Sequence, residues 1–325
     1  MQFNWELFLQ SCVIGLSDGA LIALIALGYT LVYGIVELIN FAHGEVFMMG
    51  AFMAATVVGL TGVSSRSPAF EIVGMALLAF AVATVFSATL NWGIDRVAYR
   101  RLRNAPRLAP LICAIGFSFI LQQVGIYWKG SNSFSPPSLI PSKLQRYNIL
   151  NEWFHLDTHI LRVRPLDLVV IGVTIPLLFV LTWFVYHTKT GKAMRATAQD
   201  REASSLMGID VNRTISIAFL VGGALAGAAG MISLYYNNSA QFSMGFRFGL
   251  FAFTAAVLGG IGNLRGAVLG GFIIGFLWSW SDGFLKEYFP IWGAQWTPLL
   301  IFGVLVITMV FKPSGLFGEQ TADKV

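Results

Sequence analysis

The sequence predicts an all-α integral membrane protein, a polytopic bundle of about eight or nine transmembrane helices. Of its 325 residues, 56% are hydrophobic and 11% are charged, whereas about a quarter of the residues of an average soluble domain are charged. Several stretches contain no Asp, Glu, Lys, Arg or His: 72–94, 108–128, 214–246 and 288–311. Each is long enough for the roughly 20 apolar residues that a helix needs to cross the hydrocarbon core. Because polar and apolar residues do not alternate in them, they favour helices over the strands of a membrane barrel.

The apolar segments predict nine helices along the chain. They are expected at 10–36, 46–64, 70–93, 108–128, 166–186, 213–236, 249–262, 266–281 and 296–312. The first is expected to remain in the protein, because residues 1–10 contain no Lys or Arg and so lack the positive region of a cleavable signal peptide. Two interpretations stay open for residues 249–281, either two crossings or a broken, re-entrant pair, so the prediction is eight or nine crossings.

Basic residues in two short loops predict the orientation of the helices. Residues 96–107 contain five arginines, and residues 188–213 contain five lysines and arginines. Two helices separate these loops, so both lie on one side, and short basic loops face the cytoplasm. The segment 129–165 is then external, although it also holds basic residues. Counting helices places the N-terminus outside and the C-terminus in the cytoplasm.

Glycines spaced four residues apart predict where helices pack together. Helices in lipid gain little from hydrophobic burial, so small residues that let two backbones approach are expected at their interfaces. The alternative is the generally high glycine content of membrane helices. The spaced glycines are Gly223 with Gly227, the series Gly262, Gly266 and Gly270, and Gly271 with Gly275.

The loop 188–213 encodes a short helix with defined ends. Asp200 is a suitable N-cap, and Glu202 lies in the first turn, where the helix dipole favours a negative charge. Gly208 suits the left-handed position that closes a helix. A capped helix in a cytoplasmic loop is expected to dock onto a soluble partner; a solvated turn between two membrane helices is the alternative.

The residues of this short helix resemble a known motif. Glu202-Ala203-Ser204, followed four residues later by Gly208, is similar to the E-A-A-x-x-x-G loop of bacterial ABC importer permeases, with Ser204 in place of the second alanine. In those permeases the loop forms the coupling helix that enters a cleft on the ATPase subunit. The resemblance therefore implies ATPase-coupling roles for Asp200, Glu202, Ala203, Ser204 and Gly208.

Other segments resemble one family of such permeases. Gly28–Glu45 is similar to an early signature of the branched-chain amino-acid permease family, and Ala255–Gly271 to its late glycine-rich segment. Pro313–Gly318 also fits that family. The resemblance spans nearly the whole chain apart from 129–165, and it points to the LivH-type permease subunits of that family's importers.

This resemblance implies that residues 1–325 form a single permease domain, multi-pass in the bacterial inner (plasma) membrane. The implied function is the import of branched-chain or related amino acids. The implied partners are a second homologous permease subunit, two cytoplasmic ABC ATPase subunits, an external substrate-binding protein and membrane lipid, with no nucleic acid. No catalytic residue, metal site or bound cofactor is expected in this chain, and ATP and Mg would be used by the ATPase subunits. Consistently, Gly191-Lys192 is followed by alanine and does not complete a phosphate-binding loop.

Alternative functions stay open from the sequence. A permease of the same family could carry urea or short amides. A self-contained secondary transporter would need coupling-ion residues deep in its helices, and a membrane-embedded enzyme would need a cluster of His, Asp or Glu. The later helices are nearly free of charge, which disfavours both. The sequence His155-Leu-Asp157-Thr-His159 is interpreted as a polar loop rather than a metal site.

Two polar interruptions of the apolar sequence are candidates for the substrate pathway. Ionisable groups at membrane depth usually face a bundle interior or a water-filled cavity, and glycine-interrupted segments mark the route in many carriers. The alternative is that both interruptions are turns that simply face water. The candidate pathway residues are Glu37, Asn40, His43, Glu45, Gly262, Asn263 and Arg265.

Overall fold

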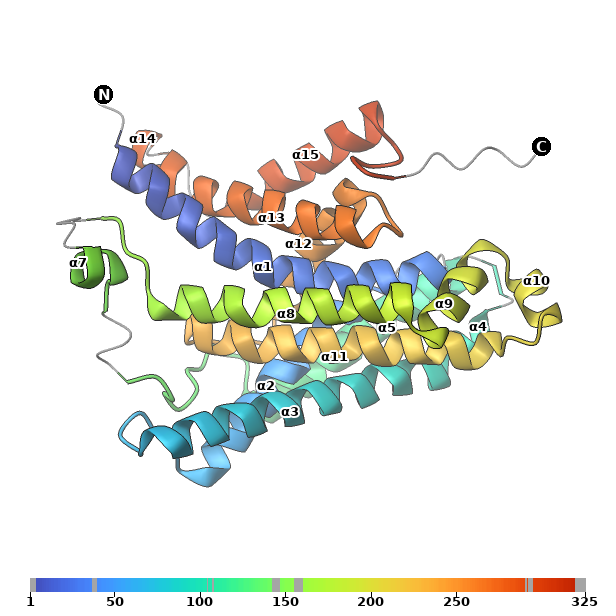
Figure 1. Ribbon diagram of the computed structural model, residues 1–325, viewed down its shortest axis with the longest axis horizontal. Coiled ribbons are helices and arrows are strands. Elements are labelled where there is room, and N and C mark those ends of the chain that lie inside the picture. The colour runs from blue at the N-terminus through green and yellow to red at the C-terminus, as the bar shows by residue number, and fades with distance from the viewer. Residues whose placement is uncertain are drawn as a thin grey trace.

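The computed structural model describes residues 4–36, 40–103, 105–106, 108–141, 147–154, 160–289, 291 and 295–318. Glu37 and the segment from His155 to His159 lie outside these described residues. Within them the chain is built from helices (Figure 1), and the extended pairing is an isolated bridge between Phe134 and Ala240. The fold class predicted from the sequence, an all-α membrane protein, is confirmed.

Each of the nine predicted apolar segments is a helix in the structure. These helices are α1 (Trp5–Val36), α2 (His43–Thr61), α3 (Ala69–Ile94), α5 (Leu108–Lys129), α8 (Pro165–His187), α11 (Val211–Asn237), α12 (Met244–Gly259), α13 (Leu264–Ser279) and α15 (Thr297–Phe311). Among the described residues, seven helical runs are long and apolar enough to cross a membrane, and α12 and α15 are shorter apolar helices.

Shorter helical elements extend or connect these long helices. They are the π-helical segment η1 (Asp95–Tyr99) with α4 (Arg100–Leu102), α7 (Ile149–Phe154), α9 (Lys189–Gln199), α10 (Arg201–Leu206), and the π-helical segment η2 (Trp280–Leu285) with α14 (Lys286–Tyr288). In Figure 1, α9, α10 and α4 gather at one end of the bundle and α7 lies at the other. These are called the α10 end and the α7 end below.

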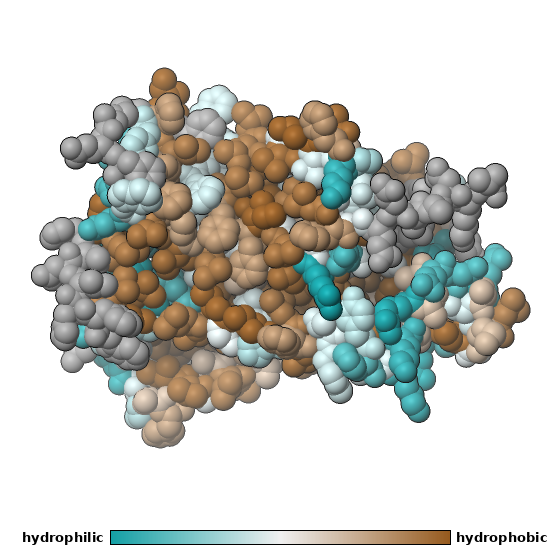
Figure 2. Space-filling view, turned by 45° about the horizontal axis from the view of Figure 1, so that its top comes forward, coloured by the Kyte–Doolittle hydropathy of each residue, from teal (hydrophilic) through white to brown (hydrophobic). Residues whose placement is uncertain are grey.

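The outer surface of the bundle is apolar, as lipid contact requires. Large hydrophobic side chains are exposed along α3, α5 and α8, for example Leu77, Phe119 and Phe179. Figure 2 shows apolar residues over most of the visible face, with hydrophilic residues gathered toward the α10 end. Helices α1, α2 and α11 are instead mostly buried within the bundle, α1 along its second half.

Small residues form the closest helix contacts. A Cβ atom built on Gly223 or Gly227 of α11 would lie 2.5 Å from the carbonyl oxygen of Ser87 or Ala83 on α3. Gly275 of α13 packs directly against the backbone of α1 in the same way. Since no larger residue would fit, these glycines do mark helix interfaces, as their spacing predicted.

Helices α2 and α12 meet inside the bundle. A Cβ atom on Gly44, in the first turn of α2, would lie 2.8 Å from the Cα atom of Gly249 on α12, and Gly245 packs against the same turn. From this contact α12 runs to the α10 end, and the run from Leu264 through Tyr288 returns along the bundle. Residues 249–281 therefore belong to two antiparallel helices, and the second is longer than the predicted 266–281.

The segment 312–318 packs onto the turn between α12 and α13. The backbone N–H groups of Leu316 and Phe317 donate hydrogen bonds of 2.8 and 3.0 Å to the carbonyl oxygens of Leu258 and Gly259. Gly315 adopts a φ of 79°, and a Cβ atom there would lie 2.5 Å from the backbone of Gly260. Two segments that resemble the same family in sequence are thus one structural unit at the α10 end.

Candidate functional site

The loop 188–213 contains two helices, α9 and α10, where the sequence predicted one. Thr188 caps α9 by accepting a 3.0 Å hydrogen bond from the backbone N–H of Gly191. Gly191 is required at this corner, because a Cβ atom there would collide with the carbonyl oxygens of α8. Helix α9 buries Met194 and Thr197, three residues apart, against its neighbours. That spacing was the signal for α9, and it was obscured by the lysines and arginine that surround the buried positions.

Helix α10 has the ends that the sequence predicted. The Asp200 carboxylate accepts a 2.9 Å hydrogen bond from the backbone N–H of Ala203. Gly208 follows the last turn with a φ of 83°, a left-handed conformation that favours glycine. Ser204 is buried against the protein, whereas Glu202 and Ala203 are exposed. The named coupling residues therefore build a short helix with both ends capped.

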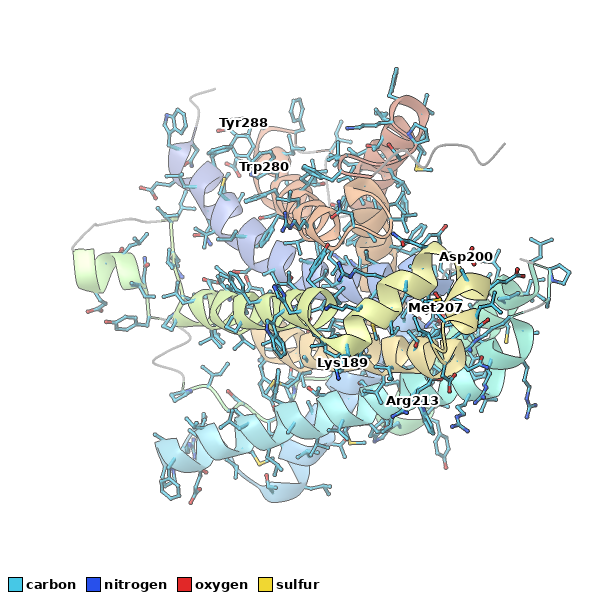
Figure 3. All side chains as sticks on the ribbon, turned by 45° about the vertical axis from the view of Figure 1, so that its right-hand side comes forward. Lys189, Asp200, Met207, Arg213, Trp280 and Tyr288 are labelled. Carbon is cyan, nitrogen blue, oxygen red and sulfur yellow. The ribbon has the colours of Figure 1, made fainter. Side chains whose placement is uncertain are left out.

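Two apolar side chains that the sequence reasoning did not single out form the tip of α10. Leu206 is 87% exposed and Met207 is 83% exposed. Figure 3 labels Asp200 and Met207, which lie at the two ends of α10. Two adjacent, almost fully exposed apolar side chains next to polar residues are typical of a protein interaction site.

A hydrogen bond ties α10 to the core helix α1. The Arg201 guanidinium donates a 2.9 Å hydrogen bond to the carbonyl oxygen of Ile35, in the last turn of α1. Helix α9, which precedes α10, also packs against α1, α8 and α11. A force applied to α10 would therefore reach α1 directly.

Asn40 lies in a buried polar network at the start of α2. Its side-chain amide donates to Asn91 at 3.3 Å and accepts from the Tyr99 hydroxyl at 3.0 Å. Asn91 in turn donates a 2.6 Å hydrogen bond to the carbonyl oxygen of Phe219 on α11. The network joins α2, α3, η1 and α11 and satisfies polar groups that lie away from water.

His43 and Glu45 are also buried. The His43 ring stacks edge-on against Tyr29 of α1 with 4.8 Å between ring centroids. The Glu45 carboxylate accepts hydrogen bonds of 3.1 Å from Ser118 and 2.8 Å from Gln122, both on α5. Asn40, His43 and Glu45 therefore face the bundle interior, and the alternative that they form a turn facing water is wrong for these three residues.

The other three candidate pathway residues lie at the α10 end. The Asn263 side chain caps α13 by accepting a 3.1 Å hydrogen bond from the backbone of Gly266, and it donates to the carbonyl oxygen of Phe317 at 2.8 Å. Gly262 and Arg265 are exposed. A Cβ atom built on Gly34 of α1, just before the first interruption, would lie 3.4 Å from the Cα atom of Gly262. Among the described residues, the first interruption is therefore buried in the bundle, whereas the second lies at the surface of the α10 end.

The sequence analysis did not identify Arg247 as a candidate functional residue. Arg247 lies in the first turn of α12 and is exposed. It is the single charged residue between Arg213 and Arg265. That isolation within a long apolar sequence was the signal that could have identified it.

The likeness to known proteins extends over nearly the whole chain. Residues 11–310 match the family model described as the branched-chain amino acid transport system permease component. The chain is 37% identical over 321 residues to the high-affinity branched-chain amino acid transport system permease protein BraD of Pseudomonas aeruginosa, covering 98% of each chain. It is 34% identical over 320 residues to LivH of Escherichia coli strain K12, also covering 98% of each chain. Both candidate sites lie within these matched regions.

Proposed function

We propose that this chain, which belongs to the branched-chain amino acid transport permease family, is the membrane-spanning subunit of an importer for branched-chain amino acids. Its relatives BraD and LivH carry that transport activity in their names. The observation that carries the proposal is α10, a capped helix with Leu206 and Met207 exposed at its tip and with Arg201 bonded to α1. A helix of this kind can transmit the movement of a soluble partner into the membrane bundle.

This arrangement and the motif at Glu202 to Gly208 support a set of partners. Two ABC ATPase subunits would bind and hydrolyse ATP with Mg, and one of them would receive α10. A second permease subunit of the same family would complete the channel. A substrate-binding protein would deliver the amino acid at the α7 end. This chain would contribute no ATPase site of its own.

The charge distribution supports an orientation with the α10 end in the cytoplasm of a bacterial cell and the bundle in its inner membrane. Exposed basic residues at that end include Arg96, Arg100, Lys192 and Arg213. At the α7 end, Arg164 forms a 2.9 Å ion pair with Asp167. Excess positive charge in short loops marks the cytoplasmic side.

Uptake by the reconstituted assembly tests the proposed function. The chain would be placed in proteoliposomes with its second permease, ATPases and binding protein, and uptake of labelled leucine, isoleucine, valine, urea and acetamide would be compared. ATP-dependent uptake of at least one branched-chain amino acid is expected. Uptake of urea or acetamide alone, or uptake that persists without the ATPases, would contradict the proposal.

A further inference from the structure

Arg247 contacts a residue in the interior of a helical run that is long enough to span the membrane. Its guanidinium stacks over the Trp278 ring, 4.7 Å from the centroid. Trp278 belongs to the continuous helical run from Leu264 to Tyr288. With a rise of 1.5 Å per residue, it lies about 21 Å from one end of that run and about 15 Å from the other. The 25-residue run is about 37 Å long, so a hydrocarbon core of roughly 30 Å centred on it contains Trp278 and the guanidinium stacked on that ring.

The guanidinium has no anionic partner among the residues that the structure describes. The ion pairs found there join Arg103 to Asp95 and Arg164 to Asp167. Asp282, the acidic residue nearest in sequence to Trp278, instead accepts hydrogen bonds from Trp278 and Thr297. Asp18 of α1 lies within electrostatic reach of Arg247 without forming an ion pair.

This part of the surface cannot face lipid. A charged side chain exposed to the bilayer centre is costly, and such residues face a bundle interior or a water-filled cavity. Stacking on Trp278 and Phe251 lowers the cost without removing it. The surface beside Arg247, including Phe246, which is 55% exposed, must therefore meet water or another protein.

We propose that Arg247 lines the water-filled substrate route and binds the carboxylate of the amino acid as it passes. The inference rests on the proposed function, which supplies a substrate with a carboxylate and an aliphatic side chain. A guanidinium pairs with carboxylates through two parallel hydrogen bonds. The neighbouring rings of Phe246, Phe251 and Trp278 offer the apolar surface that an aliphatic side chain needs. The first two turns of α12 and one residue of α13 thus present both kinds of contact.

The first test changes the charge. Arg247→Gln is expected to lower leucine uptake per ATP hydrolysed at least tenfold, while Arg247→Lys retains part of it. The control is Arg96→Gln, because Arg96 is an exposed arginine that stacks on Trp92 at 5.0 Å but lies at the α10 end. Uptake by Arg247→Gln equal to that of wild type would overturn the inference and leave the proposed function intact. A wild-type assembly that imports no branched-chain amino acid would contradict the proposed function itself.

The second test asks whether water and leucine reach this surface. Phe246→Cys, in a chain with Cys12 and Cys113 replaced by serine, is expected to react with a charged thiol reagent in the assembled transporter. Leucine-loaded binding protein should slow the reaction in the presence of ATP, and adding Arg247→Gln should abolish that protection. Leu299→Cys, 61% exposed on α15, is the lipid-facing control and should react at least tenfold more slowly.

Two results would overturn the inference even if one variant assembled poorly. If Phe246→Cys reacts as slowly as Leu299→Cys and Arg247→Gln loses the second permease on purification, the guanidinium contacts that subunit instead of substrate. If Phe246→Cys reacts quickly with no protection by leucine, the surface meets water but binds no amino acid.

Discussion

The Arg201 guanidinium donates a 2.9 Å hydrogen bond to the carbonyl oxygen of Ile35, so the first residue of α10 is fastened to the last turn of α1. Helix α1 is buried along its second half, and it packs against α11, α12 and α13. A displacement of α10 by a partner is therefore passed to the helix that contacts most of the bundle. This connection is independent of the packing of α9.

Removing the Arg201 side chain should weaken coupling while leaving partner binding in place. Arg201→Ala loses a hydrogen bond from a charged donor, which typically contributes about 1.5 to 3 kcal/mol when its partner is shielded from water. We expect the ATPases to co-purify normally and leucine uptake per ATP hydrolysed to fall several-fold. Arg195→Ala is the control, because Arg195 donates at 3.3 Å to Tyr186 of α8 rather than to α1. Equal uptake by the two variants would contradict a role for the link to α1.

Replacing the two apolar residues at the tip of α10 should weaken ATPase binding, whereas Arg201→Ala should weaken coupling and leave binding intact. Leu206→Ser with Met207→Ser removes two exposed apolar side chains that make no contribution to the core. We expect the chain to insert and fold normally but to lose most of its bound ATPase, measured by co-purification in detergent. Leu60→Ser provides the control, since Leu60 is 82% exposed at the far end of α2. Retention of the ATPase by the double variant would exclude the tip as a contact.

The space around Gly208 should admit a larger side chain. The left-handed backbone conformation of this residue should nevertheless exclude β-branched residues. No atom lies within 4 Å of a Cβ atom built at Gly208, yet its φ is 83°. A non-glycine residue in the left-handed region costs about 1 to 2 kcal/mol, and a β-branched residue is the least suited to it. Gly208→Val should therefore loosen the end of α10 and reduce ATPase association, whereas Gly208→Asn should retain more of it. Equal association for the two variants would show that this conformation is unimportant.

Asn91 should be essential for the stability of the segment that leads into α2. Asn91→Ala would remove the acceptor of the buried Asn40 side-chain NH2 group and a side-chain donor to the Phe219 carbonyl oxygen. An unpaired buried polar group costs about 1 to 3 kcal/mol, so the melting temperature of the purified protein should fall clearly. Asn212→Ala removes an asparagine that bonds Arg103 at the surface, and its effect should be small. A similar effect of both substitutions would contradict the importance of the buried network.

The sequence was sufficient where local pattern determines structure. Apolar length located the helices, and the spacing of Gly223 and Gly227 identified an interface because close approach excludes any side chain. The caps of α10 were likewise local. The surroundings of Asn40 could not be predicted in this way. The sequence was compatible both with the bundle interior and with a turn facing water, because the partners Asn91 and Tyr99 lie far along the chain.

The remaining misses have physical causes as well. Helix α9 was overlooked because its buried face is narrow and polar residues dominate its composition. Arg247 was overlooked because a search for uncharged stretches treats a lone charge as a boundary. Its significance depends on depth in the bundle, which its contact with Trp278 supplies.

The packing of residues 312–318 on the α12–α13 turn has a consequence for biosynthesis. The carbonyl oxygens of Leu258 and Gly259 receive their partners only after Leu316 and Phe317 have been made, more than fifty residues later. The turn therefore leaves the ribosome without these two hydrogen bonds, and its final form waits until Phe317 has been made. A chain that ended before Gly315 would contain every helix that the structure describes but would lack these two hydrogen bonds at the α12–α13 corner.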